Sequence, residues 1–133
     1  MRTTALAVAL SLVAGVAHGA CASSGVAGKW SFKIRRGAII YRCPDVTITS
    51  AGAMTGNCSA VDPDPAAFTL RSTTPVRVAA NCALSGEFTL SHPQQTDGYA
   101  IRGAMNRSMD TMGMTPFAWP NFTHTIWMDG YKQ

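Results

Sequence analysis

The sequence predicts a small all-β domain, and three observations support this prediction. Short stretches of alternating apolar and polar residues recur through the chain, and a period of two is typical of strands with one buried face. Turn-forming pairs such as Ala51-Gly52 and Asp97-Gly98 separate these stretches. Charged residues make up only 14% of the chain, which contains 12 glycines and 7 prolines. This composition excludes a coiled coil and argues against a helical bundle.

The N-terminal segment has the features of a secretory signal peptide. Arg2 supplies a positive charge, and residues 5–17 form an apolar core that is too short to span a bilayer. We therefore expect residues 1–19 to be a signal peptide and residues 20–133 to form a single exported domain, periplasmic or extracellular. No later stretch is apolar for long enough to span a membrane.

The cleavage site has two candidate positions. Small residues precede both Ala20 and Ser23, so cleavage after Gly19 and cleavage after Ala22 both fit. A lipoprotein acylated at Cys21 is a rival interpretation, but His18 stands where lipoprotein signals carry an aliphatic residue.

Each alternating stretch is expected to form one strand. In the first, Trp30 and Ile34 share one face, whereas Lys33 and Arg35 share the other. The later apolar faces are, in chain order, Val46 and Ile48; Phe68 and Leu70; Val76 and Val78; Leu84, Phe88 and Leu90; Tyr99 and Ile101; and Phe122, Ile126 and Met128. Turns are expected at Ala51-Gly52, Asp62-Pro63-Asp64-Pro65, Ser91-His92-Pro93 and Asp97-Gly98. About eight such strands are typical of an antiparallel up-and-down barrel or a sandwich.

Three glycines fall in the same phase as their apolar neighbours. Gly56, Gly86 and Gly103 each follow the pattern alanine, large apolar residue, polar residue, glycine. A core-facing glycine weakens a strand unless the backbone bends there or another group approaches closely. We expect bends in a tightly curled barrel, and a glycine-lined ligand cavity is the alternative.

The four cysteines predict two disulfides that pin the domain. An even number of cysteines in a small exported chain is typical of disulfide bonding, and their spacing lacks the close pairs of zinc sites. We expect Cys43–Cys58, because these residues bracket a predicted hairpin, together with Cys21–Cys82. Cleavage after Ala22 would remove Cys21 and leave one thiol without a partner.

Gly28-Lys29-Trp30 opens the first strand and resembles the G-x-W start of the lipocalin and avidin group of small barrels. A cysteine shortly before this motif, Cys21, is also similar to avidins. The resemblance covers three residues. It implies an up-and-down barrel in which the tryptophan packs across the closed end and ligands enter at the other end, and it identifies no ligand.

The expected function is non-catalytic binding, either of a small apolar ligand inside the barrel or of an envelope partner on its surface. Trp30, Tyr99, Trp119 and Trp127 are the candidate ligand-binding residues, since aromatic rings combine large area with polar handles. Packing in the core is the alternative role for these rings. The alternative function is that of a secreted inhibitor or a structural envelope protein.

A methionine cluster offers a second alternative, periplasmic Cu(I) binding. Thioether sulfur is a soft ligand that suits Cu(I). The candidate ligands are Met105, Met109, Met112, Met114 and His124. Methionine is also an adaptable core filler, which is the competing explanation.

Catalytic motifs give no support for an enzyme. The sequence contains no phosphate-binding loop, no G-x-S-x-G and no H-E-x-x-H, so we expect neither enzymatic activity nor a cofactor.

The outer face of the first strand carries three cations, Lys29, Lys33 and Arg35. These side chains could contact anionic lipid, and a solvated face is the alternative. Nucleic acid is not an expected partner of an exported domain.

Overall fold

The computed structural model describes residues 20–60, 66–115, 117–119 and 126–133. These ranges contain one short 3-10 helix and nine strands. They are η1 (Ser23–Val26), β1 (Gly28–Arg36), β2 (Ile39–Ile48), β3 (Met54–Ala60), β4 (Ala66–Val78), β5 (Ala83–His92), β6 (Gln95–Met105), β7 (Thr111–Met114), β8 (Phe117–Trp119) and β9 (Ile126–Lys132). The predicted signal peptide, residues 1–19, and the predicted turn at residues 62–65 lie outside the described residues.

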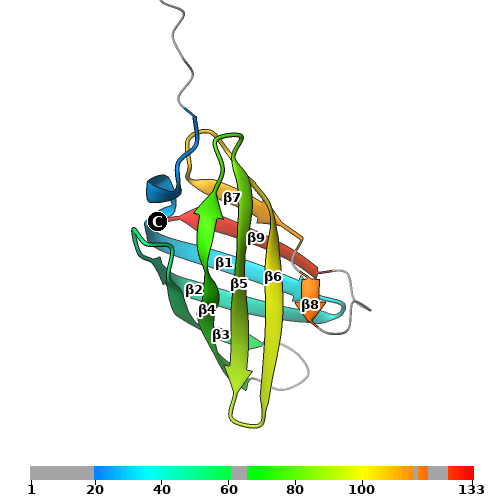
Figure 1. The fold of residues 1–133 in the computed structure, drawn as a ribbon. Helices are drawn as coiled ribbons and strands as arrows, with labels where there is room; N and C mark the ends of the chain where they lie inside the picture. Colours follow the sequence, from blue (N-terminus) through cyan, green and yellow to red (C-terminus); the bar gives the residue numbers. More distant parts are fainter. Residues whose placement is uncertain (1–19, 61–65, 116, 120–125) are drawn as a thin grey trace, which may run out of the picture.

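The strands form one antiparallel barrel. Strands β1 to β6 pair in sequence, β6 pairs with β7, β7 with β9, and β9 with β1, so the sheet closes on itself (Figure 1). Because β7 and β8 both pair with β6, at different points along it, they act as two pieces of one wall strand. The result is an eight-stranded up-and-down barrel, which confirms the predicted all-β class and selects a barrel over a sandwich.

The predicted alternation is present in the strands. In β1, Trp30, Phe32 and Ile34 are buried, whereas Lys33 and Arg35 are exposed. Among the described residues no polar or charged residue is buried. The largest fully buried side chains, which fill the barrel, are Trp30, Tyr99, Phe88, Ile34, Ile48, Met54, Leu70, Leu90, Ile126, Met128, Val26 and Val46.

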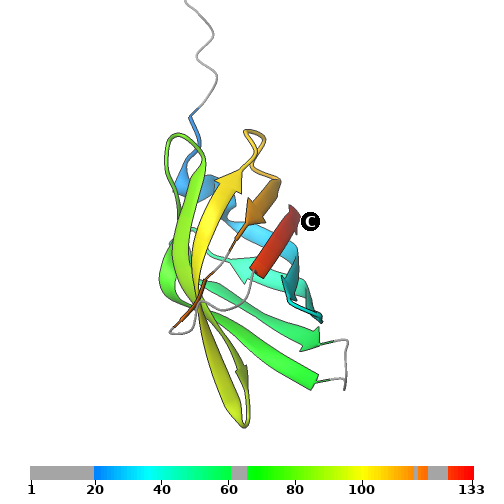
Figure 2. The ribbon, with the colours of Figure 1, turned by 90° about the vertical axis from the view of Figure 1, so that its right-hand side faces the viewer.

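One end of the barrel is closed by the segment that precedes β1. The indole Nε1 of Trp30 donates a hydrogen bond to the carbonyl oxygen of Val26 in η1 at 2.8 Å. The amide of Val78 at the end of β4 donates to Ser23 Oγ at 3.0 Å. Figures 1 and 2 show η1 at one end and the β5–β6 hairpin extending beyond the other end.

Both predicted disulfides are present. Cys43–Cys58 joins neighbouring strands β2 and β3 across a short sequence separation of 15 residues. Cys21–Cys82 spans 61 residues and ties the segment before η1 to the connection between β4 and β5. The second bond therefore fastens the closing segment onto the barrel.

The core-phase glycines allow neighbouring backbone to approach closely. A Cβ at Gly103 would lie 2.7 Å from the Cα of Met114 on the adjoining strand. Gly86 has a φ of +142°, which other residues rarely adopt, and a Cβ there would lie 3.0 Å from the Pro75 carbonyl oxygen. Neighbouring backbone, rather than a ligand cavity, therefore occupies the space beside each of the three glycines, and the expected bends stay a prediction.

One predicted turn is wrong. Asp97-Gly98 lies inside β6, where Asp97 pairs with Leu90 and Gly98 with Thr89. The chain has already reversed at Pro93 and Gln94, so the hydrogen-bonded pairing of β5 with β6 continues through Asp97 and Gly98.

In the described part of the chain, no helix has the length and hydropathy needed to cross a membrane.

Candidate functional site

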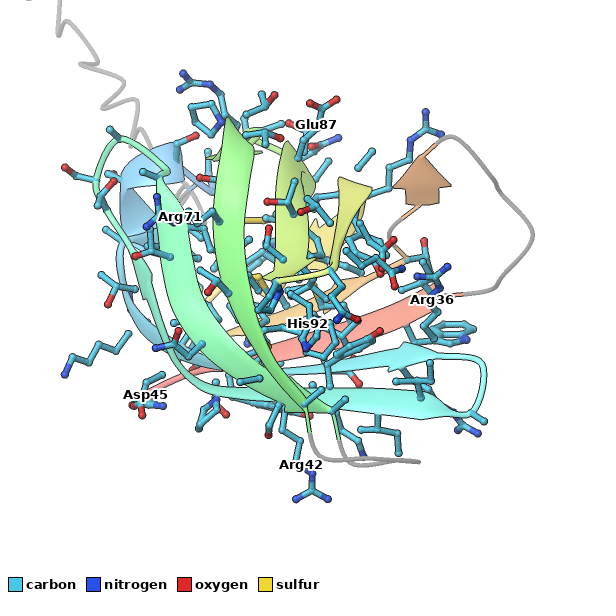
Figure 3. The ribbon with its side chains drawn as sticks, turned by 90° about the horizontal axis from the view of Figure 1, so that it is seen from below. Arg36, Arg42, Asp45, Arg71, Glu87 and His92 are labelled. Carbon is cyan, nitrogen blue, oxygen red and sulfur yellow. A yellow bond between two sulfur atoms is a disulfide. The ribbon has the colours of Figure 1, made fainter. Side chains whose placement is uncertain are left out.

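The end of the barrel opposite η1 carries polar side chains at inward positions. Arg36 is the last residue of β1 and continues the inward phase of Ile34. Asp97 precedes Tyr99 by two residues in β6 and therefore shares its inward phase. We call this rim the open end; Figure 3 looks toward it and labels Arg36 and His92.

Arg36 joins the two sides of the rim. Its Nη1 donates hydrogen bonds to Asp97 Oδ2 and to the Tyr99 hydroxyl oxygen, each at 3.2 Å. The side chains of Arg36 and Asp97 remain 25% and 23% exposed. Both bonds come from Nη1, and a side-chain hydrogen bond with Arg36 also acts on Tyr41 across the rim.

Burial and charge set the protonation of this cluster. Burial raises the pKa of Tyr99 to about 12, although the charge of Arg36 opposes the change. Burial also raises the pKa of Tyr41 against the same opposing charge. Burial alone would lower the pKa of Arg36, but Tyr99 and Asp97 more than offset it, so that pKa is raised. Both phenols are neutral and the guanidinium is charged near neutral pH.

Aromatic rings line the open end and the layer beneath it. Phe68 makes an edge contact with Tyr41, with ring centroids 5.1 Å apart, and a tilted contact with His92 at 5.4 Å. Below them Phe88 and Tyr99 stack at 5.1 Å. Strands β2, β4 and β5 thus supply one group of contacting rings, and β5 and β6 supply a stacked pair.

A depression of about 500 Å³ opens between these groups. Its lining residues are Arg36, Gly37, Ala38, Ile39, Tyr41, Phe68, Gln95 and Asp97. The volume lies in the range of small-molecule sites, which combine apolar walls with a few polar groups. The arrangement can hold an apolar ring against Phe68 and Ile39 while the guanidinium pairs with an anionic group.

The four predicted ligand-binding residues are not brought together. Tyr99 lies beneath the open end, whereas Trp30 is buried at the closed end. Trp127 is 57% exposed on the outer wall. The backbone of Trp119 pairs with Gly98 in β6, and its side chain lies outside what the structure describes.

The predicted copper ligands lie in several environments. Met105 and Met112 are buried and occupy paired positions on β6 and β7. Met114 is also buried, and Met109 packs against Gly25 near the closed end. His124 lies outside the described residues. Copper binding therefore stays a prediction. Among described residues, no three His, Cys, Asp or Glu side chains gather as a metal site.

Sequence reasoning missed Arg36, Asp97 and Phe68 as neighbours at one rim. The signal that could have found them is the inward phase itself. Extending the phase of Ile34 by one step reaches Arg36, and extending that of Tyr99 backwards reaches Asp97. A charged residue at the end of a buried phase marks the place where a barrel strand reaches solvent.

Comparisons with known proteins identify no relative of this chain. No protein-family model matches the chain, and searches of curated proteins and of solved structures found no significant match. The functional conclusions therefore rest on the geometry of the residues themselves.

Proposed function

We propose that the protein is a non-catalytic exported binding protein that holds a small ligand at the open end of its barrel. The observation that carries this proposal is the depression of about 500 Å³, which has a partly exposed guanidinium at its edge and an aromatic wall. The ligand class that fits has an apolar or aromatic body and one carboxylate or sulfonate group.

The packing below the rim favours a ligand at the mouth rather than deep inside. Phe88, Leu90 and Tyr99 lie beneath the depression and are at most 2% exposed. A ligand would rest on this layer, with its anion within reach of Arg36. Arginine suits this role because its planar fork matches the two oxygens of a carboxylate.

The chemistry of the cluster supports binding rather than catalysis. A general acid or base works best when its pKa lies near the operating pH. The pKa of Tyr99 is raised to about 12, and the guanidinium of Arg36 keeps its proton. Neither group is suited to proton transfer near neutral pH.

Export is supported by the disulfides. Bonds such as Cys21–Cys82 and Cys43–Cys58 persist in oxidising compartments.

The G-x-W resemblance supports the placement of the ligand at the open end, because it implies a tryptophan at the closed end and ligand entry at the other end.

The test uses 8-anilinonaphthalene-1-sulfonate as an anionic aromatic probe, titrated by fluorescence into the oxidised protein. Wild type is expected to bind one molecule. Arg36→Gln is expected to weaken binding by about 10- to 100-fold, as for loss of a charged hydrogen bond. Phe68→Ala should also weaken it, through loss of the ring contact.

The matched control is Arg71→Gln, which removes an exposed arginine from the outer face of β4. Thermal unfolding establishes that each variant is folded. Equal dissociation constants for wild type and Arg36→Gln would refute the proposal.

A further inference from the structure

The outer wall of the barrel carries a line of aromatic side chains on β9. Trp127 and Tyr131 are 57% and 58% exposed and are the large hydrophobic residues exposed in the described part of the chain. Both project outward, because Ile126, Met128 and Gly130 between and beside them are buried. The two rings therefore lie on the same outer face of β9, with Asp129 between them.

Cations on the neighbouring strands lie beside these rings. In the register of β1 against β9, Arg35 is opposite Trp127 and Lys33 is opposite Asp129. On β2, Arg42 is opposite Lys33, and in Figure 3 it points away from the barrel. We call these six residues the β9 face: Lys33, Arg35, Arg42, Trp127, Asp129 and Tyr131.

Positive charge dominates the β9 face. Lys33, Arg35 and Arg42 are exposed, and Asp129 is the single acid among the six residues. The ion pair found among the described residues joins Arg36 to Asp97 at the open end. The three cations of the β9 face thus form no ion pair with a described carboxylate, although Asp129 lies directly opposite Lys33.

Trp127 borders two shallow hollows in the wall, and Asp129 lines both of them. A depression of about 320 Å³ between Trp127, Lys33 and Arg35 lies on one side of the indole, and one of about 240 Å³ that includes Gly113 and Thr115 lies on the other. Figure 2 shows β9 in red beside β7 in orange. The indole of Trp127, which is 57% exposed, therefore projects from the barrel wall between the two hollows.

We propose that the β9 face docks the protein onto an anionic lipid bilayer, a role that goes beyond ligand binding at the open end. Tryptophan and tyrosine favour the boundary between headgroups and acyl chains because each ring has an apolar body and a polar tip. Lysine and arginine near an anionic leaflet add attraction for each charge. Charge complementarity therefore selects an anionic surface as the occupant.

Asp129 makes the proposal sharply testable. Its carboxylate lies between the two rings and opposes an anionic surface, so Asp129→Asn should tighten binding to anionic vesicles. The expected gain is up to about fivefold, the value of one charge near such a surface. An acidic protein partner without lipid contact would not produce vesicle binding.

The experiment measures cosedimentation of the folded, oxidised protein with vesicles of equal parts phosphatidylglycerol and phosphatidylcholine. Wild type is expected to bind these vesicles and not pure phosphatidylcholine. Lys33→Gln with Arg35→Gln should lower affinity by roughly 25-fold, about fivefold for each charge. Trp127→Ala should also weaken binding.

Two controls separate this surface from the rest of the molecule. Arg71→Gln with Arg77→Gln removes the same charge from the outer face of β4 and should leave vesicle affinity unchanged. Arg36→Gln at the open end should also leave it unchanged, so failure of either proposal is recognised independently. No vesicle binding by wild type, or an equal loss in the β4 double variant, would overturn the proposal.

Discussion

The two ends of the barrel use their side chains differently. At the closed end, Trp30 is fully buried, its indole is bonded to Val26, and the Cys21–Cys82 disulfide fastens the covering segment. At the open end, Arg36 and Asp97 are partly exposed beside a depression. At the closed end the indole N–H is bonded within the fold, whereas at the open end the guanidinium of Arg36 stays partly exposed to solvent.

A small barrel of this kind can assign stability to one end and binding to the other. Burial of a large ring and closure of a long chain loop both favour the folded state. A partly exposed ion pair contributes little to stability, so Arg36 can be optimised for a ligand. The comparison predicts that variants of the closed end lower stability and variants of the open end lower affinity.

The largest expected effect is at Trp30. Trp30→Ala should lower the free energy of unfolding by about 3–5 kcal/mol, because it removes a fully buried ring and leaves a cavity. Phe68→Ala, at the half-buried open end, should cost clearly less. Urea unfolding of both variants measures the contrast. If the domain with Trp30→Ala fails to fold, Trp30→Phe removes the indole hydrogen bond, at about 1–3 kcal/mol, and leaves a smaller cavity than alanine does. Equal losses of unfolding free energy for Trp30→Ala and Phe68→Ala would show that the closed end does not carry the greater share of the stability.

The closed end was partly predictable from sequence. The alternation around Trp30 and Ile34 indicated a buried strand face, and the cysteine count indicated the disulfides. The hydrogen bond from Trp30 to Val26 was not predictable, because no periodic pattern marks η1. Its formation depends on how the segment between Cys21 and β1 folds across the barrel end.

Removal of each disulfide should give the next largest losses of unfolding free energy, and the loss should be greater for Cys21–Cys82 than for Cys43–Cys58. Replacing Cys21 and Cys82 with serine frees a loop of 61 residues, for which chain entropy predicts a loss of about 4 kcal/mol. Replacing Cys43 and Cys58 frees a loop of 15 residues, with a loss of about 3 kcal/mol. Differential scanning calorimetry of the two double variants checks the ranking. The reverse order would show that the covering segment contributes less than its loop length implies.

A smaller effect is expected from Tyr99 at alkaline pH. Its pKa is raised from 10.0 to about 12 in the folded protein, so the fold favours the neutral phenol. This stabilisation is complete below pH 10 and is lost as the pH rises from about 10 to about 12. Between pH 8 and pH 11, wild type should lose about 1 kcal/mol more than Tyr99→Phe in urea unfolding.

The matched control for this prediction is Tyr131→Phe, which changes an exposed tyrosine on the outer wall. That variant should follow the alkaline profile of wild type. If Tyr99→Phe has the same profile as well, the phenol at the open end is not held in its neutral form by the fold.

The open end could not be recognised from sequence because its residues come from distant strands. Arg36 and Asp97 are 61 positions apart and meet only because the barrel closes. Asp97-Gly98 also resembles a turn, and this local signal was overridden by the hairpin ladder on both sides. Tyr99 was a candidate ligand-binding residue, but its partners required the three-dimensional register.

The most direct test of the division between the two ends is a ¹⁵N NMR titration with 8-anilinonaphthalene-1-sulfonate. We predict that the largest amide shift changes fall in residues 36–41 and 95–99, at the rim of the open end, while the amides of Val26 and Trp30 stay unchanged. Changes centred on η1, or spread evenly over the barrel, would contradict the account.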